Sequence, residues 1–400
     1  MLKSAAIALC VLAGLLAVSQ VRAAGEQVVI GVIEDLSGVY ADTGGQGSIE
    51  ASTMAIADFG GTVLGKKIIL LSVDHQNKPD IGASKFREWA DQQGLNALLA
   101  GSNTGVSIAM AKVAAAKKVP FFAVGAGGAS LTGADCTPYT VHYVYDTTAL
   151  GNGTASAIVR EGGKTWFFVT ADYAFGTQLQ DAAARVVLAN GGKVLGAVRA
   201  PLGTTDYSSF LLQAQASRAQ VLGLANAGTD FINSLKAADE FGITKTMRPA
   251  ALLTFITDIH SLTLQTAQGL YLTTSWYWDL NDETRGFAKR FFAKVKKQPT
   301  MAHAGYYSAT LQYLNAVKAV GSTDPGLVMA QLKKSRINDV FTKNGYIRAD
   351  GLMVHTMYVM QVKTPAESKN PWDYYKVVKV MSGEEADGSQ ADPACVLVKK

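Results

Sequence analysis

Residues 28–54 constrain the fold of this chain most, because they combine an apolar run, a long polar loop and an amphipathic segment. The uninterrupted run at 28–33 is rich in β-branched residues and predicts a buried strand. A helix capped by Ser48 is expected to follow the loop. In open α/β sheets, ligands bind at the loops that follow the carboxyl ends of strands. The loop at 34–47 is therefore a candidate small-molecule site, with a purely solvated connection as the alternative.

The N-terminus has the composition of an export signal. Lys3 supplies positive charge, residues 5–18 are apolar, and residues 21–23 end in the small alanine that signal peptidase requires. The apolar run is too short to span a membrane comfortably. We therefore expect a cleaved signal peptide at residues 1–24 and a protein that is located in the periplasm.

Length and charge narrow the classes of protein that remain. Removing residues 1–24 from the 400-residue chain leaves 376 residues, enough for two domains of ordinary size. The loss of Lys3 and Arg22 lowers the net charge from +5 to +3. A charge this weak gives no indication of nucleic-acid binding. Charged residues make up 17% of the chain and apolar residues 48%, a balance typical of a compact globular protein.

Two cysteines, Cys136 and Cys395, remain after cleavage of the signal. An exported protein meets an oxidising compartment, so we expect a disulfide between them. This bond would tie the C-terminal segment back to the first half of the chain. Two unpaired thiols are the alternative.

The strand, loop and helix pattern recurs along the chain and starts again near residue 150. Strands are expected at 28–33, 67–74, 95–100, 119–124, 165–170, 193–200, 220–225, 250–255 and 270–276. Helices are expected at 80–93, 106–117, 151–161, 177–189, 208–217, 231–241, 284–297, 303–320 and 324–334. Residues 354–362 and 374–380 alternate like the strands of a C-terminal hairpin. This order predicts an α/β protein with two successive sheets.

Polar and aromatic residues gather in the loops at the predicted strand ends. The loop at 101–105 offers two hydroxyls, an amide and the free N–H groups of a helix start, which together suit a carboxylate. Ordinary capping of the helix is a compatible interpretation. The glycines at 125–128 let the backbone approach a ligand closely. The candidate contacts from the other loops are Tyr40, Asp42, Tyr173, Asn226, Thr254 and Phe255. Whether Asp230 or Asp258 also reaches the ligand stays open.

Two glycine-rich segments approach nucleotide-binding motifs without matching them. At 60–67, Lys67 stands where a phosphate-binding loop needs serine or threonine, and the helix precedes the loop. At 125–130, Ser130 replaces the third glycine of G-x-G-x-x-G. The five histidines show no metal-ligand spacing. We therefore expect no cofactor, no metal site and no enzymatic activity, with a paired-carboxylate hydrolase as the less favoured alternative.

Several segments form an ordered set along the chain. They are VVIGVIEDLSGVYADTGG, AGSNTGVSIAM, VPFFAVGAGGASLTG, VTADYAFGTQL and LGLANAGTDFINSLKAADEFGI. This set resembles the solute-binding proteins of ABC importers of the Leu/Ile/Val-binding type, over essentially the whole chain after the signal. The resemblance implies two Rossmann-like lobes with parallel sheets, joined by three hinge crossovers and closing around a ligand. It also implies an ABC permease as partner and a monomeric protein.

The same resemblance implies where the lobes divide and where a ligand carboxylate binds. The first lobe would contain residues 25–147 and 277–345, and the second residues 148–276 and 346–400. Crossovers are expected near 145–150, 273–278 and 341–352. The ligand carboxylate would bind to the first lobe at Ser102, Asn103, Thr104, Ala126 and Gly127.

The chain departs from the amino-acid binders of this family at two positions. Those proteins usually have a threonine where Gly127 falls, and a glutamate that holds the ligand ammonium after the strand ending here near Phe255. Without that carboxylate, burial of an ammonium is costly, whereas Tyr40, Tyr173 and Phe255 favour an aromatic or apolar body. We expect an aromatic acid as ligand, with a hydrophobic amino acid close behind. A ligand-sensing module for a membrane receptor is the alternative function.

Overall fold

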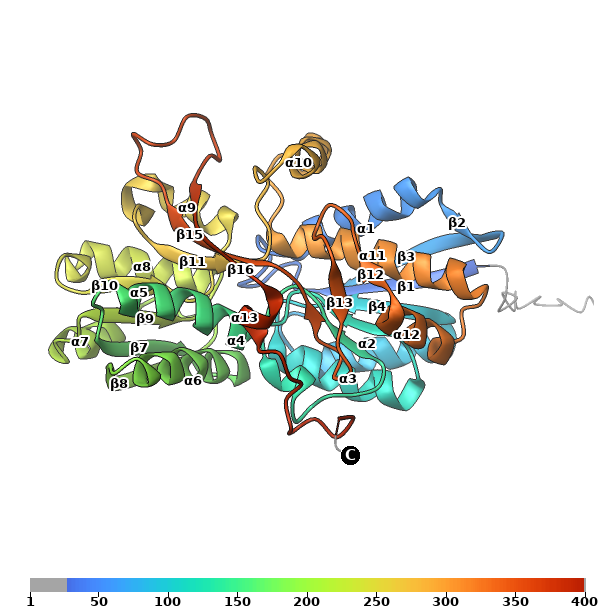
Figure 1. The fold of residues 1–400 in the computed structure, drawn as a ribbon, viewed down its shortest axis with the longest axis horizontal. Helices are drawn as coiled ribbons and strands as arrows, with labels where there is room; N and C mark the ends of the chain where they lie inside the picture. The colour runs from blue at the N-terminus through green and yellow to red at the C-terminus, as the bar shows by residue number, and fades with distance from the viewer. Residues whose placement is uncertain (1–26, 399–400) are drawn as a thin grey trace, which may run out of the picture.

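The computed structural model describes residues 27–398, so the expected signal peptide at 1–24 lies outside the described residues. Figure 1 shows two lobes lying next to each other along the longest axis, each built on its own central sheet. Among the described residues, no helix is both long and apolar enough to cross a membrane.

The first lobe contains a six-stranded sheet with the order β2–β3–β1–β4–β5–β6. Its strands are β1 (Gln27–Glu34), β2 (Thr62–Val63), β3 (Lys66–Asp74), β4 (Leu95–Ala100), β5 (Phe121–Ala123) and β6 (Thr140–His142). The central strand β1 pairs in parallel with β3 and β4. Residues 28–33 are all buried, as the uninterrupted apolar run predicted, and so is Glu34, which the sequence placed in the polar loop.

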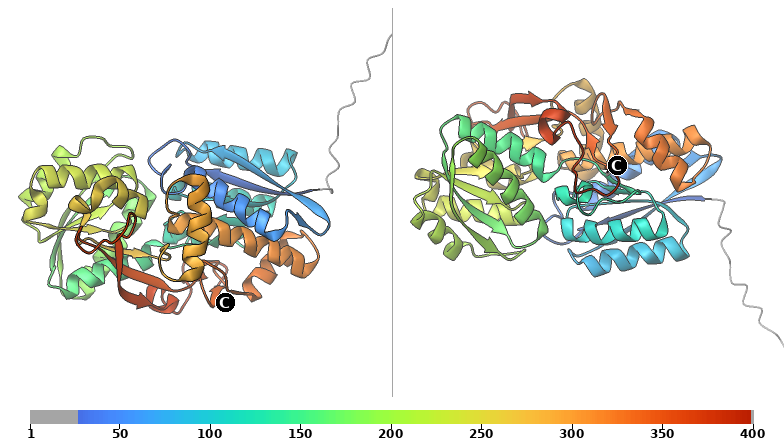
Figure 2. Two further views of the ribbon diagram at one scale, coloured as in Figure 1. Left: turned by 90° about the horizontal axis from the view of Figure 1, so that it is seen from above. Right: turned by 60° about the horizontal axis from the view of Figure 1, so that its bottom comes forward.

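Helices cover both faces of this sheet (Figure 2). On one face, α1 (Gly45–Phe59) packs against α11 (Met301–Val320), with α10 (Asp282–Val295) and α12 (Pro325–Lys334) beside them. On the other face, α2 (Pro79–Gln92) packs against α3 (Thr104–Lys117). Helix α11 thus brings a late part of the chain back to the first sheet.

The second lobe contains a four-stranded parallel sheet with the order β10–β9–β7–β8. Its strands are β7 (Thr165–Ala171), β8 (Lys193–Ala200), β9 (Val221–Ala225) and β10 (Arg248–Ala251). Its helices are α4 (Thr147–Leu150), a π-helical turn (Gly151–Ala155), α5 (Ser156–Arg160), α6 (Ala174–Ala189), α7 (Ser208–Ala216), α8 (Thr229–Glu240) and α9 (Ile256–Ala267). The predicted helix at 151–161 is therefore present as part of a continuous helical stretch at 147–160 that contains the π-helical turn.

The C-terminal part of the chain adds two small sheets to the two lobes. Strands β15 (Met357–Val362) and β16 (Tyr375–Met381) form the predicted antiparallel pair and join β11 (Tyr271–Thr274). Three shorter strands that the sequence pattern missed form the other sheet: β12 (Arg336–Ile337), β13 (Gly345–Ile347) and β14 (Met353–Val354). A bridge from Leu352 to His142 attaches this second sheet to the end of β6. Helix α13 (Gly383–Asp387) follows β16.

Two boundaries predicted from the sequence can be compared with the helices and strands: the start of the first helix and one lobe boundary. The prediction that Ser48 caps the first helix is wrong, because α1 already begins at Gly45 and Ser48 is buried within it. The predicted lobe boundary between residues 345 and 346 falls inside β13, which pairs with β14. We propose that the third crossover lies at residues 355–356 instead, between β14 and β15. The other lobe boundaries stay predictions.

The predicted disulfide between Cys136 and Cys395 is present. It joins the segment after α13 to the loop that precedes β6. Both cysteines are buried. The C-terminal segment is thereby fastened to the first lobe.

Candidate ligand-binding site

A small cavity lies between the two lobes, at the carboxyl ends of the strands of both sheets. The first lobe lines it with Tyr40, Thr43, Ser102, Gly125, Gly127, Tyr145 and Ala302. The second lobe lines it with Phe175, Ala227, Leu253 and Phe255. Its free volume of about 10 Å³ has room for about one water molecule, so the two lobes lie close together around it. The position is the one that the strand-end argument predicted.

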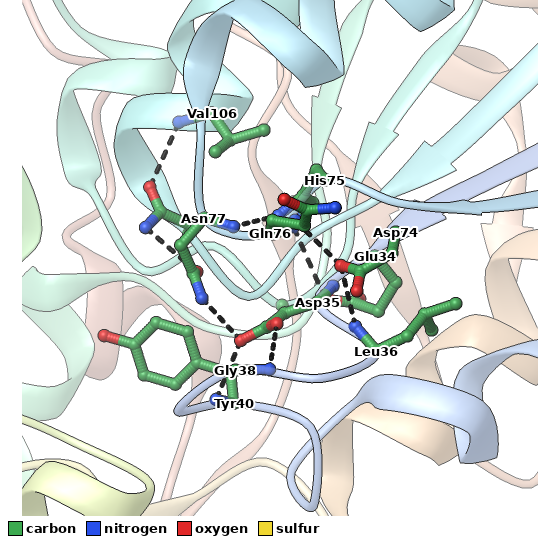
Figure 3. Close-up of polar contacts among 12 residues, drawn as sticks. Glu34, Asp35, Leu36, Gly38, Tyr40, Asp74, His75, Gln76, Asn77 and Val106 are labelled. Atoms are coloured by element: carbon green, nitrogen blue, oxygen red, sulfur yellow. Dashed lines mark hydrogen bonds and ion pairs between the residues drawn. The ribbon is translucent and has the colours of Figure 1, made fainter. Parts of the chain in front are cut away.

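The carboxylate of Asp35 shapes the loop after β1 that carries Tyr40 (Figure 3). It accepts hydrogen bonds from the backbone N–H of Gly38 (2.7 Å) and of Tyr40 (2.9 Å). It also accepts one from the side-chain amide of Asn77 (2.6 Å). Such side-chain to backbone bonds fix a turn. They hold the Tyr40 ring at the cavity wall.

Three sets of hydrogen bonds join the lobes around the cavity. The hydroxyl oxygens of Tyr40 and Tyr173 lie 2.5 Å apart. The backbone N–H of Thr229 donates to the carbonyl oxygen of Val39 (3.0 Å). The backbone N–H of Ser130 donates to Oε1 of Gln178 (3.0 Å), whose amide nitrogen donates back to the Ser130 hydroxyl (3.2 Å). The two lobes are therefore in direct polar contact on several sides of the cavity.

The loop after β4 presents Ser102 to the cavity. Its backbone has a φ of 21°, an unusual value for a residue other than glycine, and strained backbone of this kind concentrates at binding sites. Within residues 27–398, the backbone N–H groups of Ser102 and Gly127 donate no hydrogen bond. Together with the Ser102 hydroxyl they form a set of donors that suits a carboxylate.

Aromatic rings form the walls around these donors. The rings of Tyr145 and Phe255 meet edge to face, with centroids 6.2 Å apart. A Cβ atom added to Gly127 would lie 2.8 Å from Cε2 of Phe175. Gly127 is therefore the position where the first lobe lets the Phe175 ring of the second lobe come close.

A buried carboxyl, that of Glu34, lies behind Ser102. It accepts hydrogen bonds from the backbone N–H of Asp35 (2.9 Å) and from the Tyr306 hydroxyl. The Ser102 side chain also lies close to this carboxyl. Burial raises the pKa of Glu34 to about 7, although its hydrogen bonds oppose the shift.

Four of the predicted ligand contacts line the cavity: Tyr40, Ser102, Gly127 and Phe255. Tyr173 lies behind them, bonded to Tyr40. The side chain of Asp42 is 62% exposed and pairs with Lys297, so it points to solvent. Its role in ligand binding, like that of the other predicted residues, stays a prediction.

The remaining predicted residues support the loops around the cavity. Asn103 caps α3 by accepting from the backbone N–H of Val106. The Thr104 hydroxyl accepts from the backbone N–H of Gly128. The other three residues also form hydrogen bonds around the cavity. The Ala126 carbonyl oxygen bonds to the His142 ring, the Asn226 amide donates to the Ser234 hydroxyl, and the Thr254 hydroxyl donates to Asp258.

The two acidic residues left open by the sequence both accept backbone hydrogen bonds within the second lobe, whereas Oδ1 of Asp258 is buried without a partner among the described residues. Asp258 lies in the first turn of α9, where Oδ2 accepts from the backbone N–H of Phe255 (2.9 Å). Burial raises its pKa to about 7. Asp230 accepts from the backbone N–H of Gly203, and burial raises its pKa to about 6. Neither residue lines the cavity.

Sequence reasoning missed seven residues that line the cavity: Thr43, Gly125, Tyr145, Phe175, Ala227, Leu253 and Ala302. Most lie in the same loops as predicted contacts, so their neighbours were the available signal. Tyr145 was placed in a crossover instead. Ala302 lies in the first turn of α11, far along the chain, and no local pattern connects it to this site.

The described residues contain no cluster of three or more His, Cys, Asp or Glu side chains that could hold a metal ion. The cavity lining in the same part of the chain has no charged side chain. The chemistry available is therefore hydrogen bonding and apolar contact.

Comparisons with known proteins agree with this architecture. The model of the periplasmic binding protein family matches residues 27–369. A periplasmic binding protein from Burkholderia mallei is 58% identical, with a TM-score of 0.92 over 94% of this chain and 100% of that chain. A branched chain amino acid ABC transporter periplasmic ligand-binding protein from Burkholderia xenovorans LB400 is 41% identical, with a TM-score of 0.80 over 90% of this chain and 97% of that one.

More distant structures share the fold. An ABC transporter solute-binding protein from R. palustris, solved in complex with benzoate, is 20% identical, with a TM-score of 0.81 over 92% of this chain and 98% of that chain. A comparison with curated proteins found no match. The predicted pair of Rossmann-like lobes is confirmed by these relatives and by the two sheets. The chain belongs to the periplasmic binding protein family, with the type I fold and the kinship to ABC-transporter ligand-binding proteins that its sequence predicted.

Proposed function

We propose that this protein captures a small organic carboxylate between its two lobes and delivers it to an ABC permease from the periplasm. The observation that carries the proposal is the cavity between the lobes, which combines hydrogen-bond donors at Ser102 and Gly127 with aromatic walls. Donors on one side and rings on the other suit an acid with an apolar body.

The charge of the cavity lining favours an acid without an ammonium group. Among the described residues that line it, none carries a carboxylate that could pair with an α-ammonium. Burying an unpaired ammonium costs several kcal/mol. Asp258 in the first turn of α9 is the nearest candidate in sequence to Phe255, and its buried Oδ1 has no hydrogen-bond partner among the described residues, but it does not line the cavity. An aromatic acid is therefore our first choice and a hydrophobic amino acid the second.

The relatives support both choices. The R. palustris protein was solved with benzoate, and a second protein from the same source with 4-hydroxybenzoate. The 41% identical relative is described as a branched chain amino acid ABC transporter protein. That description also supports an ABC permease as the partner here. We further propose that the protein acts as a monomer and is exported through its N-terminal signal.

A thermal-shift panel tests the proposal. The panel contains benzoate, 4-hydroxybenzoate, phenylacetate, cinnamate, L-leucine and L-phenylalanine. A ligand at 100 times its Kd stabilises the protein by about 2.7 kcal/mol, which gives a clear rise in melting temperature. If only the amino acids raise the melting temperature, the preference for an aromatic acid is wrong. If no acid does so, the proposed capture of a carboxylate is wrong.

The alternatives predict different outcomes. A hydrolase would convert the compound that stabilises it, so recovery of the unchanged acid by mass spectrometry after long incubation speaks against an enzyme. Uptake of the acid by membrane vesicles that contain the permease, only when the binding protein is added, separates an importer component from a sensory module.

A further inference from the structure

The carboxyl of Glu34 lies next to the residue that is proposed to receive the ligand. Glu34 ends β1 and is completely buried. A Cβ atom added to Gly44 would lie 2.8 Å from Oγ of Ser102 and 3.2 Å from Oε2 of Glu34. Both oxygens therefore border the same small space. Ser102 faces the cavity, whereas Glu34 lies one layer behind it.

The Ser102 hydroxyl has a single proton, and two acceptors compete for it. An ionised Glu34 is an acceptor only, so the nearby hydroxyl would donate to it and turn its lone pairs toward the cavity. A ligand carboxylate would then meet an oxygen without a proton, and a second negative charge behind it. A protonated Glu34 needs no proton from Ser102, which leaves the hydroxyl free to donate to the ligand.

The groups around Glu34 supply hydrogen bonds but no positive charge. The backbone N–H of Asn77 donates to Nδ1 of His75 (3.0 Å), so the ring proton lies on Nε2, 3.9 Å from Oε1 of Glu34. Burial lowers the pKa of His75 to about 4, and the ring is neutral near pH 7. Figure 3 shows His75 beside Glu34 and Asp35.

The other titratable groups that face Glu34 do not compensate a negative charge either. Burial raises the pKa of Tyr306 from α11 and of Tyr145 from the loop after β6, so both phenols stay neutral. The negative charge of Asp35 in the same loop raises the pKa of Glu34 further. A ligand anion that arrives at Ser102 would act on Glu34 in the same direction.

We propose that Glu34 is a positioning residue whose proton leaves the Ser102 hydroxyl free for the ligand carboxylate, so that capture takes up one proton from solvent. This inference rests on the proposed function, because it requires that the ligand group at Ser102 is a carboxylate. It deepens that function by making the affinity for the acid depend on pH.

The pH dependence of ligand affinity in the native protein tests the inference. The ligand is benzoate, or L-leucine if that acid gives the larger thermal shift. The inference requires that the acid binds only when Glu34 is protonated, and the pKa of Glu34 without ligand is about 7. Binding should therefore be about thirtyfold weaker at pH 8.5 than at pH 6. The variant Glu34→Gln carries no titratable proton, and its amide can donate to Tyr306 or Ser102. Its affinity should change less than about twofold over the same interval.

The matched control is Asp258→Asn, an acid-to-amide change at another buried carboxyl with a pKa of about 7. An asparagine can still accept from the backbone N–H of Phe255. The absolute affinity of this variant can differ, but the thirtyfold dependence on pH should persist. If this variant loses the dependence and Glu34→Gln keeps it, the inference is wrong.

Calorimetry gives a second measurement that needs no variant. Titration of the native protein at pH 7.5 in phosphate and in Tris, two buffers with different ionisation enthalpies, yields the number of protons bound. A pKa of about 7 predicts about three quarters of a proton taken up per ligand. Saturable binding with no proton uptake would overturn the inference and leave the proposed function intact. Absence of binding by every acid tested would overturn both.

Discussion

The hydroxyl oxygens of Tyr40 and Tyr173 lie 2.5 Å apart, and this contact joins the first lobe to the second at the edge of the cavity. Tyr40 comes from the loop after β1, whereas Tyr173 comes from the loop after β7. Burial raises the pKa of both phenols, so the contact is a hydrogen bond between neutral groups. It can form only when the lobes are closed.

Removal of this bond should weaken ligand binding without removing a ligand contact. Tyr173 does not line the cavity, so Tyr173→Phe tests the bond between the lobes alone. A neutral hydrogen bond is worth about 0.5–1.5 kcal/mol, which predicts a Kd roughly two to ten times higher. Isothermal titration calorimetry with the best ligand measures it.

The control for Tyr173→Phe is Tyr313→Phe, because the buried hydroxyl of Tyr313 has no hydrogen-bond partner within the described residues. That variant should bind the ligand as the native protein does. An equal loss of affinity in both variants would mean that general loosening, and not the contact between the lobes, causes the effect.

Replacement of Ser102 should have a larger effect, because the proposed bond involves a charged group. A hydrogen bond to a charged group contributes about 1.5–3 kcal/mol, so Ser102→Ala should raise the Kd by roughly ten- to a hundredfold. The measurement is again calorimetric. The control is Ser107→Ala in α3, the helix that follows the Ser102 loop, where the buried hydroxyl has no partner among residues 27–398. Unchanged affinity in Ser102→Ala would contradict the proposed carboxylate site.

Local sequence patterns predicted most of the helices and strands. The strands at 95–100 and 193–200 have the predicted bounds, because apolar runs between turn residues define buried or half-buried strands well. Strand β12 is two residues long, and β13 and β14 have three and two residues. Segments this short show no periodicity, so nothing in the sequence separates them from loop.

The candidate site was predicted as a set of loops and only partly as residues. Tyr40 and Ser102 line the cavity because strand-end loops converge in an open α/β sheet, a rule that needs no tertiary detail. Glu34 was not singled out. Its partner Tyr306 lies 272 residues away, and the burial that raises its pKa depends on the packing of α11. Long-range packing of this kind has no local signature.

Gly127 should tolerate no side chain when the lobes close. A Cβ atom there would lie 2.8 Å from Phe175, closer than Cβ atoms approach in folded proteins, and 3.2 Å from Tyr145, a tight contact. Gly127→Ala should therefore hold the lobes apart and weaken binding at least tenfold, a cost of about 1.4 kcal/mol or more. Small-angle scattering with saturating ligand should show a more extended molecule than the native protein.

The control for Gly127→Ala is Gly286→Ala in α10, where an added Cβ atom meets no other atom within 4 Å. This change should leave affinity and shape unaltered and stabilise the helix slightly. Native affinity in Gly127→Ala would show that the Phe175 ring moves aside easily and that the close approach is not needed.

The disulfide should stabilise the protein by restricting its unfolded chain. Cys136 and Cys395 are 259 residues apart, and bonds that close long loops typically contribute roughly 2–4 kcal/mol. The double variant Cys136→Ser with Cys395→Ser should unfold at a lower urea concentration. A reductant should shift the native protein to the same midpoint and leave the variant unchanged. Detection of two free thiols in the native protein by mass spectrometry would contradict the bond.

The buried carboxyl of Asp258 should make stability depend on pH. Burial raises its pKa from 3.8 to about 7, so between these values the folded state binds more protons than the unfolded state. The free energy of unfolding therefore falls as pH rises through this interval, by a few kcal/mol at most. Asp258→Asn removes the charge and keeps an acceptor for the backbone N–H of Phe255, so the variant should be more stable than the native protein at pH 8 and similar to it at pH 4.5.

Urea unfolding of the two proteins at both pH values measures this difference. Burial lowers the pKa of His75 and His303 to about 4, which makes the folded state less stable as pH falls below about 6.5. Both proteins share that effect, so it cancels when the variant is compared with the native protein at one pH. The control is Asp181→Asn on the exposed side of α6, the same acid-to-amide change at a side chain in solvent. An equal change in stability at both pH values in Asp258→Asn would show that the Asp258 carboxyl is already ionised at pH 4.5, contrary to its burial in α9.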